Sequence, residues 1–288
     1  MEANKKVKTG LVLEGGAMRG MFTAGILDVF MENDIVFDGV IGVSAGAAFG
    51  CNYISKQIGR ALRYNKNYCN DKRYVSWRSW FKTGNLYNVE FAYYKLVNEL
   101  DVFDRETFKA NPTEFYVTCT DVTTGKAVYH KCTDGGDVDI EWMRASASMP
   151  LVSKVVELEG YKLLDGGVAD SIPLEFFQNN GYENNVVILT QPHGYQKGKN
   201  KIVPLARIVL RKYPKMVKAM KDRHIRYNES LKYILQQEEK GNTLVIRPKL
   251  KLEIGKIEHN PDKLDEVYQI GRKTGLEYID QVREFLNK

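Results

Sequence analysis

The sequence GVIGVSAGAAFG, residues 39–50, contains the pentapeptide GVSAG at residues 42–46. The apolar run Val36–Val43 leads into this pentapeptide and predicts a strand, and the small residues of Ala45–Ser55 after it predict a helix. A serine that projects from a sharp strand-to-helix turn needs glycine on both sides, because larger side chains there would collide with neighbouring backbone. The pattern GxSxG therefore indicates a tight turn that exposes Ser44 at the end of a buried strand.

Upstream of this turn the chain shows the same alternation of elements. Val7–Leu13 is β-branched and apolar and predicts a strand, which ends at the glycine-rich loop 14–20. Met21–Asn33 follows with apolar residues at helical spacing. This order of strand, loop, helix, strand, turn and helix is typical of a parallel sheet covered by helices. We therefore predict an α/β fold with a mostly parallel central sheet sandwiched between helices.

The rest of the chain extends this plan. The aromatic stretch 56–113 has no clear period and is expected to cap one end of the sheet. Further predicted elements are a strand at Glu114–Thr120, a hairpin at 152–164 with the two-residue turn Glu159-Gly160, short strands at Val186–Leu189 and Thr243–Arg247, and a closing helix at Asp262–Leu286. Because the last strand needs a sheet to join, residues 197–240 are interpreted as a helical excursion. We predict a single domain, residues 1–288, with a motif-bearing core at about 9–190 and a closing strand and helix at 243–288.

Length and composition are those of an ordinary globular protein. The 288 residues are 43% hydrophobic and 27% charged, which excludes the disordered, collagen-like and small disulfide-rich classes. No apolar run reaches the roughly 20 residues of a membrane span. The polar start Met1–Lys8 also lacks the apolar stretch of a signal peptide. We therefore expect a soluble, cytoplasmic protein.

The four cysteines and four histidines are scattered along the chain. No CxxC pair occurs, so neither a disulfide framework nor a structural zinc site is expected. The cysteines are predicted to be buried free thiols. We expect no metal site.

Positive charge is concentrated in one segment. Residues 197–226 contain eleven Lys or Arg and one acid, Asp222, so this segment carries a net charge of +10, whereas the whole chain carries +6. Its apolar residues recur at spacings near three and four, which predicts a basic amphipathic helix, or two helices broken near Pro214. One interpretation is a peripheral contact with anionic lipid headgroups, and the other is a solvated helix face packed on the core. No helix-turn-helix or aromatic RNA-binding motif accompanies the charge, so nucleic acid is not expected as a partner.

Ser44 is the candidate nucleophile, and the sequence offers two candidate bases for it. A serine hydroxyl reacts poorly until a base takes its proton. The order Ser, Asp, His of a catalytic triad is filled by Ser44, Asp165 and His193. Asp165 begins the triplet Asp-Gly-Gly at the exit of the predicted hairpin, where glycines let the backbone turn the carboxylate toward the serine. Partial burial there would raise its pKa and make it a better base. Nothing beyond chain order marks His193.

The glycine-rich loop Gly15–Gly20 can bind an anion. Its backbone N–H groups lie at the positive end of the first predicted helix, where they can hold a phosphate or an oxyanion that forms during a reaction. The spacing differs from GxGxxG, so a dinucleotide is not favoured. Together and in this order, the loop, the GxSxG turn, the block Arg144–Pro150 and the Asp165 triplet resemble patatin-like phospholipases over about residues 9–190. The family usually has glycine at the position of Ala17.

The resemblance implies a serine acyl hydrolase that cleaves carboxylic esters of phospholipids, lysophospholipids or neutral glycerolipids without a metal or cofactor. It implies a catalytic dyad in which Ser44 is the nucleophile and Asp165 is the base, with an acyl-enzyme intermediate. The residues implied for the oxyanion hole are Gly15, Gly16, Ala17 and Arg19. The glycines implied for the nucleophile elbow are Gly42 and Gly46.

Two other functions stay open on the sequence alone. One is an esterase with a Ser-Asp-His triad that uses His193 as its base. The other is a non-catalytic lipid-binding or anion-binding module on the same fold. Acyl-chain length, headgroup, positional preference and oligomeric state are not specified by these motifs.

Overall fold

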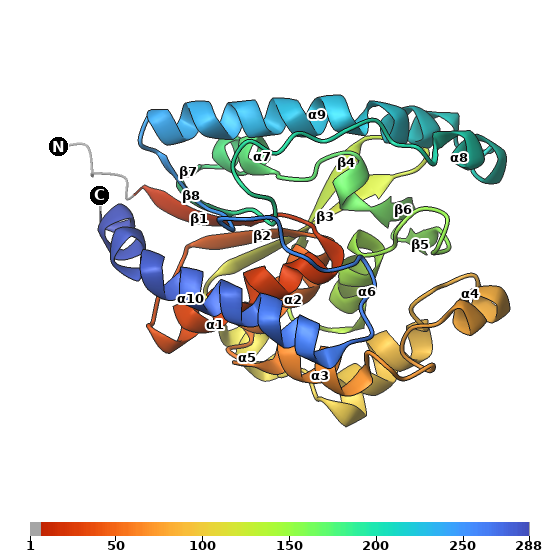
Figure 1. The fold of residues 1–288 in the computed structure, drawn as a ribbon, viewed down its shortest axis with the longest axis horizontal. Coiled ribbons are helices and arrows are strands. Elements are labelled where there is room, and N and C mark those ends of the chain that lie inside the picture. Colours follow the sequence, from red (N-terminus) through yellow and green to blue (C-terminus); the bar gives the residue numbers. More distant parts are fainter. Residues whose placement is uncertain (1–6, 288) are drawn as a thin grey trace.

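Strands that are apolar along most of their length form the centre of the computed structural model, which describes residues 7–287 (Figure 1). Most of the polar start Met1–Lys8 therefore lies outside the described residues. Eight strands form one mixed sheet in the order β5-β6-β3-β2-β1-β7-β8, with β4 also paired to β3. The parallel strands are β1 (Lys8–Leu13), β2 (Gly39–Val43), β3 (Glu114–Asp121), β7 (Tyr182–Ile188) and β8 (Thr243–Ile246). The antiparallel additions are β4 (Ala127–Cys132), β5 (Val156–Leu158) and β6 (Tyr161–Asp165).

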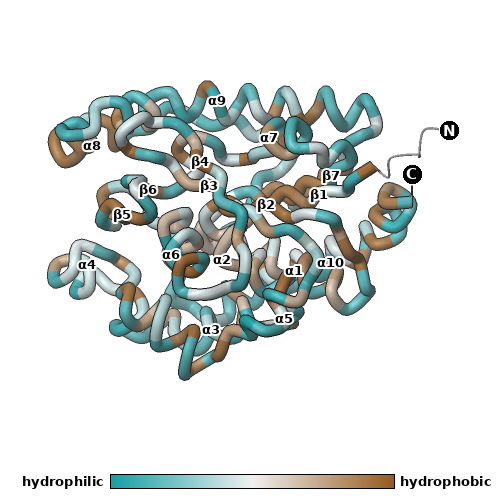
Figure 2. The backbone as a smooth tube through the Cα atoms, turned by 180° about the vertical axis from the view of Figure 1, so that it is seen from behind, coloured by the Kyte–Doolittle hydropathy of each residue, from teal (hydrophilic) through white to brown (hydrophobic). Residues whose placement is uncertain are grey.

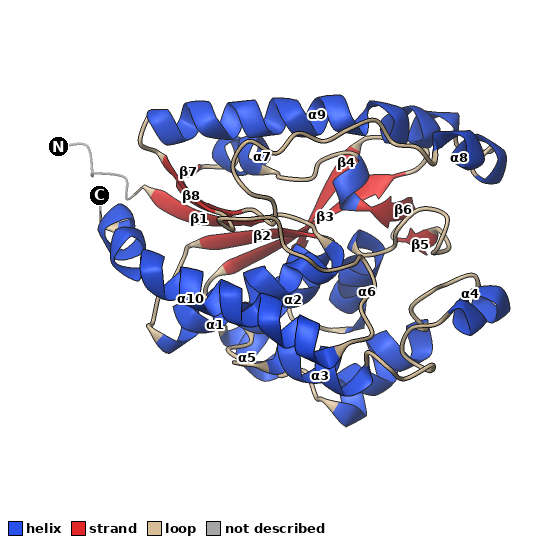
Figure 3. Ribbon diagram, viewed as in Figure 1, coloured by secondary structure: helices blue, strands red, loops and turns tan. Residues whose placement is uncertain are grey.

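Both faces of the central strands are covered by helices (Figure 3). On one face lie α1 (Gly20–Glu32), α2 (Ala45–Ile54), α3 (Arg60–Tyr68), α5 (Arg105–Ala110), α6 (Asp137–Ser146) and α10 (Pro261–Leu286). On the other face lie α7 (Leu174–Asn179), α8 (Val203–Val209) and α9 (Pro214–Glu239). The remaining segments are α4 (Trp77–Thr83), the π-helix η2 (Glu90–Leu100) and the 3₁₀ turns η1 (Ala17–Arg19) and η3 (Gly166–Val168). The predicted α/β sandwich is confirmed.

Side chains alternate between two apolar layers, as the period of a strand requires. In β1, Leu11 and Leu13 belong to the core on the α1 side, and Val12 belongs to the core on the α7 and α9 side. All three are fully buried. No helix within residues 7–287 is both long and apolar enough to cross a bilayer.

Most predicted elements occur within a few residues of their expected ends. The second strand begins at Gly39 rather than Val36, and the hairpin turns at Glu159-Gly160 with positive φ at both residues. Residues 197–240 form two helices, and the second begins at Pro214 as predicted. The sequence analysis missed β4, α6 and α7, and it resolved none of the helices α3, α4, η2 and α5 within the aromatic stretch 56–113. Four free, buried cysteines confirm the predicted thiols.

Candidate active site

The turn at Ser44 joins β2 to α2 and holds the serine in a strained conformation. Ser44 has φ +53° and ψ −118°, a backbone geometry that L-residues other than glycine rarely adopt. A Cβ on Gly42 would lie 2.6 Å from the backbone N of Ala47, and one on Gly46 would lie 2.5 Å from the carbonyl O of Leu13. Both positions therefore require glycine, as the GxSxG pattern predicts.

The register of β3 brings the Asp165 end of β6 to the same place. Val43, the last residue of β2, pairs with Thr118 of β3, and Asp165, the last residue of β6, pairs with the next residue, Cys119. Because β4 occupies the other edge of β3, β2 and β6 lie on one edge and meet end to end. Ser44 and Asp165 are thus adjacent in space although they are 121 residues apart in sequence.

Ser44 and Asp165 are joined by a buried hydrogen bond. The Ser44 hydroxyl donates to Oδ2 of Asp165 at 2.7 Å, and Oδ1 accepts the N–H of Gly167 at 2.8 Å. Burial raises the pKa of Asp165 above its ordinary value, against the opposing effects of the positive charge of Arg223 and the hydrogen bond from Ser44. The carboxylate is therefore a stronger proton acceptor than an exposed aspartate.

Ser146 fixes the backbone of the serine turn, a role that the sequence did not reveal. Its hydroxyl accepts the N–H of Ser44 at 2.8 Å and donates to the carbonyl of Thr118 at 2.6 Å. Both side-chain bonds are fully buried. The only sequence signal was its place in the block 144–150, which carried no role of its own.

Two arginines of the basic segment turn inward and hold the Asp-Gly-Gly turn. Arg223 on α9 donates from Nε to the carbonyl of Gly167. Arg226 donates to the carbonyls of Val168 at 3.0 Å and Ala169 at 3.2 Å. Not all of the positive charge of residues 197–226 therefore faces solvent or lipid, because Arg223 and Arg226 bind backbone carbonyls within the protein.

The glycine-rich loop lies directly against the serine. A Cβ on Gly15 would lie 3.1 Å from Cβ of Ser44. The N–H groups of Gly15, Gly16 and Ala17 donate no hydrogen bond to any residue in the described part of the chain. The backbone N–H of Arg19 closes the loop on the carbonyl of Gly16 at 3.2 Å, and Ala17 has φ +50°. The loop thus presents unpartnered donors beside Ser44.

A mainly apolar cavity opens at Ser44. Its volume is about 110 Å³, and Ala17 and Met18 line it beside the serine. Its walls come from α2, η2 and α6 and include Phe49, Leu96, Val97, Ile140 and Met143. The side chains of the aromatic stretch 56–113 are divided between two places. Tyr74, Tyr87 and Tyr93 line the cavity, whereas Trp77 and Phe81 of α4 are exposed.

His193 is not brought to the site. Its ring is exposed in the loop after β7, and Nδ1 lies 3.4 Å from Nη1 of Arg247. The Ser44 hydroxyl has its hydrogen bond with Asp165 instead. The geometry therefore gives no support to a triad.

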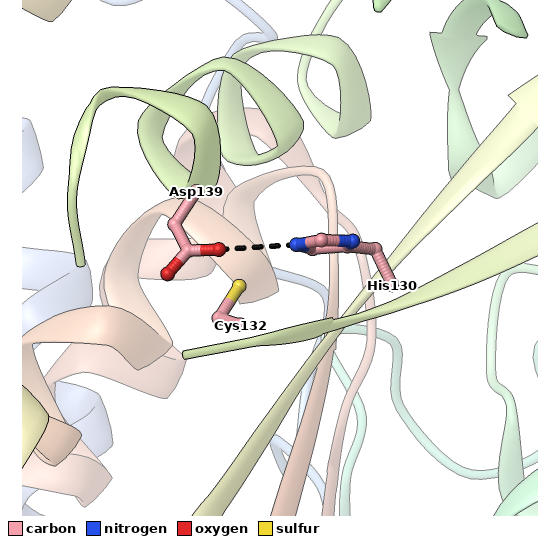
Figure 4. Close-up of side chains that lie close together, drawn as sticks. All are labelled: His130, Cys132 and Asp139. Atoms are coloured by element: carbon pink, nitrogen blue, oxygen red, sulfur yellow. Dashed lines mark hydrogen bonds and ion pairs between the residues drawn. The ribbon is translucent and has the colours of Figure 1, made fainter. Parts of the chain in front are cut away.

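Among residues 7–287, one group of His, Cys and Asp side chains could reach a single metal ion (Figure 4). Ligand atoms of His130, Cys132 and Asp139 lie within 4.8 Å of one another. His130 and Cys132 are two residues apart on β4, and Asp139 lies on α6. This spacing matches no known metal-binding motif, so the sequence did not reveal the group. Asp139 already accepts His130 Nε2 at 3.0 Å and three backbone N–H groups of residues 133–135. Although burial opposes them, these bonds hold the pKa of Asp139 below its ordinary value. The carboxylate thus caps the loop before α6 without an ion.

Comparison with known proteins identifies the family. The family model for patatin-like phospholipase matches residues 11–177, and the chain belongs to this family. A second model, a domain of unknown function (DUF6363), matches residues 213–287.

Curated relatives share moderate identity with parts or all of the chain. The uncharacterized protein YjjU of Escherichia coli (strain K12) is 30% identical over 189 residues, covering 64% of this chain and 52% of YjjU. Lysophospholipase nte1 of Aspergillus terreus is 25% identical over 300 residues, covering 95% of this chain and 18% of that protein. The chain thus spans about half or less of these relatives. The crystal structure of VipD from Legionella pneumophila aligns with a TM-score of 0.46 at 12% identity, covering 96% of this chain and 67% of VipD.

Proposed function

We propose that the protein is a serine acyl hydrolase that cleaves carboxylic esters of lipids through a Ser44–Asp165 dyad. The observation that carries this proposal is the 2.7 Å hydrogen bond between the two side chains at the mouth of an apolar cavity. Membership of the patatin-like phospholipase family supports a lipid ester as the substrate. The lysophospholipase relatives favour a phospholipid or lysophospholipid.

In the proposed mechanism, Ser44 Oγ attacks the ester carbonyl while Asp165 accepts the hydroxyl proton. The N–H groups of Gly15, Gly16 and Ala17 then stabilise the negative oxygen of the tetrahedral intermediate. This intermediate collapses to an acyl-enzyme when the alcohol leaves with the proton from Asp165. Water, activated by the same carboxylate, attacks the acyl-enzyme and releases the fatty acid and free Ser44.

The structure supports each proposed role by position. The carboxylate of Asp165 has one oxygen on Ser44 and the other on the N–H of Gly167, so its orientation is fixed before substrate binds. The unpartnered N–H groups of the glycine-rich loop need an acceptor, and an oxyanion on Ser44 would supply it. The cavity accepts the acyl chain because its walls are mainly apolar.

The first experiment is labelling with a fluorophosphonate probe followed by mass mapping of the modified peptide. We expect a single adduct on Ser44, with the label absent in Ser44→Ala and reduced at least about 100-fold in rate in Asp165→Asn. His193→Ala should label like the wild type, and it serves as the matched control for the triad. Loss of labelling in His193→Ala would favour the triad. No adduct on folded wild-type protein would contradict the enzyme and favour a binding module.

We further propose that α8 contacts an anionic membrane when the enzyme acts on a bilayer. Its side chains Leu205, Ile208 and Val209 are exposed, and the backbone at α8 is coloured as hydrophobic in Figure 2. Exposed cations follow at once at Arg211, Lys212 and Lys215. An apolar tip flanked by basic residues is the pattern of interfacial lipid binding.

A further inference from the structure

Four cations from four separate segments lie near one another, because the charges of Arg19, Arg223 and Lys256 all act on Lys197. Arg223 of α9 is bonded to the carbonyl of Gly167, two residues after Asp165. Lys197 lies with Nζ 4.1 Å over the ring of Tyr227, one helical turn along α9 from Arg223. Lys256 lines the cavity beside Ser44; it belongs to the loop from β8 to α10, which crosses the middle of Figure 1. Arg19, in η1, completes the cluster, which we call the cationic rim.

None of the four rim cations forms a direct ion pair with a carboxylate. Arg19, Lys197, Arg223 and Lys256 do not occur in the ion pairs formed within residues 7–287. Nε of Arg19 is buried without a hydrogen-bond partner in the same part of the chain. Glu14 and Asp165 act on the rim only at longer range, so four cations face two carboxylates.

The two carboxylates that lie close to the rim are already engaged. Glu14 accepts the hydroxyl of Tyr227 at 2.6 Å and the N–H of Thr190 at 2.6 Å. Asp165 accepts Ser44 and Gly167. Burial, followed by the positive charge of Arg223, lowers the pKa of Lys197 to about 8. The rim cations also repel one another, and an anionic ligand bound between them would relieve this repulsion.

We infer that the cationic rim is a subsite for the phosphate of a glycerophospholipid or lysophospholipid. The inference rests on the proposed function, because Ser44 fixes where the scissile ester lies. With the acyl chain in the cavity and the carbonyl at Ser44, the phosphate of the same molecule is only a few covalent bonds away, on the open side. Lysine ammonium groups and arginine guanidinium groups are the usual protein partners of phosphate. A neutral acylglycerol leaves the rim unsatisfied and is the poorer substrate.

The test compares two substrates with the same short acyl chain, lysophosphatidylglycerol and monoacylglycerol. Both are used as monomers below their critical micelle concentration, so that no lipid surface contributes. The measured quantity is the ratio of the two kcat/KM values. We expect Lys256→Met and Lys197→Met each to lower this ratio about tenfold, as loss of one charge-assisted contact predicts. Lys251→Met is the matched control, because Lys251 lies on the same loop but pairs with Glu253 at 3.2 Å. It should leave the ratio unchanged.

Three outcomes would overturn the inference. The first is a ratio that stays constant in both variants with activity retained, the second is an equal loss of activity on both substrates, which also leaves the ratio constant, and the third is an equal fall of the ratio in Lys251→Met. If the wild type hydrolyses neither substrate, the proposed function fails. The rim is then tested by calorimetry with a non-hydrolysable ether analogue of lysophosphatidylglycerol. About tenfold weaker binding by Lys256→Met supports the subsite, and equal binding overturns it. Inorganic phosphate that binds as tightly as the ether lipid would indicate a site for free phosphate and also overturn the assignment to a lipid.

Discussion

Asp165 is a carboxylate in a position that is almost closed to water, and its basicity follows from that position. It must be ionised to accept the Ser44 proton, yet burial raises its pKa above the ordinary value for aspartate. Activity should therefore fall as the pH falls through this raised pKa, at a higher pH than an exposed aspartate would give. We expect an acid limb in the pH profile of kcat/KM with its midpoint above the ordinary pKa of aspartate. Removing the positive charge of Lys256 should move the limb to higher pH, and Lys251→Met should not move it.

Asp165→Asn separates catalysis from stability at the same residue. The amide cannot take the hydroxyl proton, so we expect a loss of about 10³-fold or more in ester hydrolysis. Its melting temperature should equal or exceed that of the wild type, because a buried charge disfavoured by desolvation has been removed. Activity within tenfold of the wild type would contradict a catalytic role for this carboxylate.

At the scale of elements, a buried carboxylate, Asp28, lies where α1 packs on α10. Its Oδ2 accepts the hydroxyl of Tyr268 at 2.6 Å and the N–H of Gly59 at 2.9 Å. Burial raises the pKa of Asp28 to about 6. As the pH falls, the folded state therefore takes up a proton before the unfolded state does. The contribution of Asp28 to the free energy of unfolding increases as the pH falls from about 7 to about 4, and it is lost as the pH rises.

Asp28→Asn should consequently stabilise the protein at neutral pH. We expect a gain of about 1 kcal/mol at about pH 7.5 that shrinks as the pH falls and disappears only near pH 4, the ordinary pKa of aspartate, measured by urea unfolding. One amide oxygen can still accept both hydrogen bonds, since both end on the same oxygen of Asp28. Asp280→Asn on the exposed side of α10 is the control and should change neither value. A destabilised Asp28→Asn at both pH values would contradict the sign of the shift.

At the scale of the whole molecule, the proposed membrane contact of α8 can be tested by changing the charge beside it. Replacement of Arg211, Lys212 and Lys215 by Gln should weaken binding to anionic vesicles about 100-fold, at about 1 kcal/mol for each charge. Sedimentation with vesicles measures the effect. The same change of charge at exposed lysines away from α8, namely Lys232, Lys240 and Lys273, is the control. Equal weakening by the two triple variants, or none by the first, would contradict a contact through α8.

We also propose that residues 1–288 fold as one domain. The basis is that β8, which follows the helical excursion, pairs in parallel with β7 of the same sheet. One family model matches residues 11–177, before the excursion, and a second matches residues 213–287, which include α9 of the excursion as well as β8 and α10. A single cooperative unfolding transition would be expected from this arrangement.

Local pattern predicted most of the fold because its central strands are apolar on both faces. The run Val7–Leu13 and the hairpin at Glu159-Gly160 carry their own signals. The strand Ala127–Cys132 does not, since only Cys132 is buried and the sequence includes His130 and Lys131. The short helix Leu174–Asn179 covers too few turns to show a period. Both depend on packing against distant elements.

Some residues of the candidate site could likewise be predicted from local sequence, and others could not. Ser44 and Asp165 could be chosen from local motifs, and the register of β3 brings them together. Ser146 and Arg223 could not be chosen, because their partners lie 102 and 56 residues away and neither belongs to a motif with an assigned role. The positive charge around Arg223 in the sequence allowed the interpretation that this segment faces a lipid surface. In the structure, Arg223 instead binds a carbonyl within the protein.

The meeting of β2 and β6 along one edge of β3 also has a consequence for folding. Contacts between residues 121 apart close only after a long stretch of chain has been ordered, and such closure is slow relative to helix formation. Helical signal should therefore return early in refolding, whereas reaction of Ser44 with a fluorophosphonate must wait until β6 has docked. The time at which Ser44 becomes reactive during refolding therefore reports when β6 docks on β3.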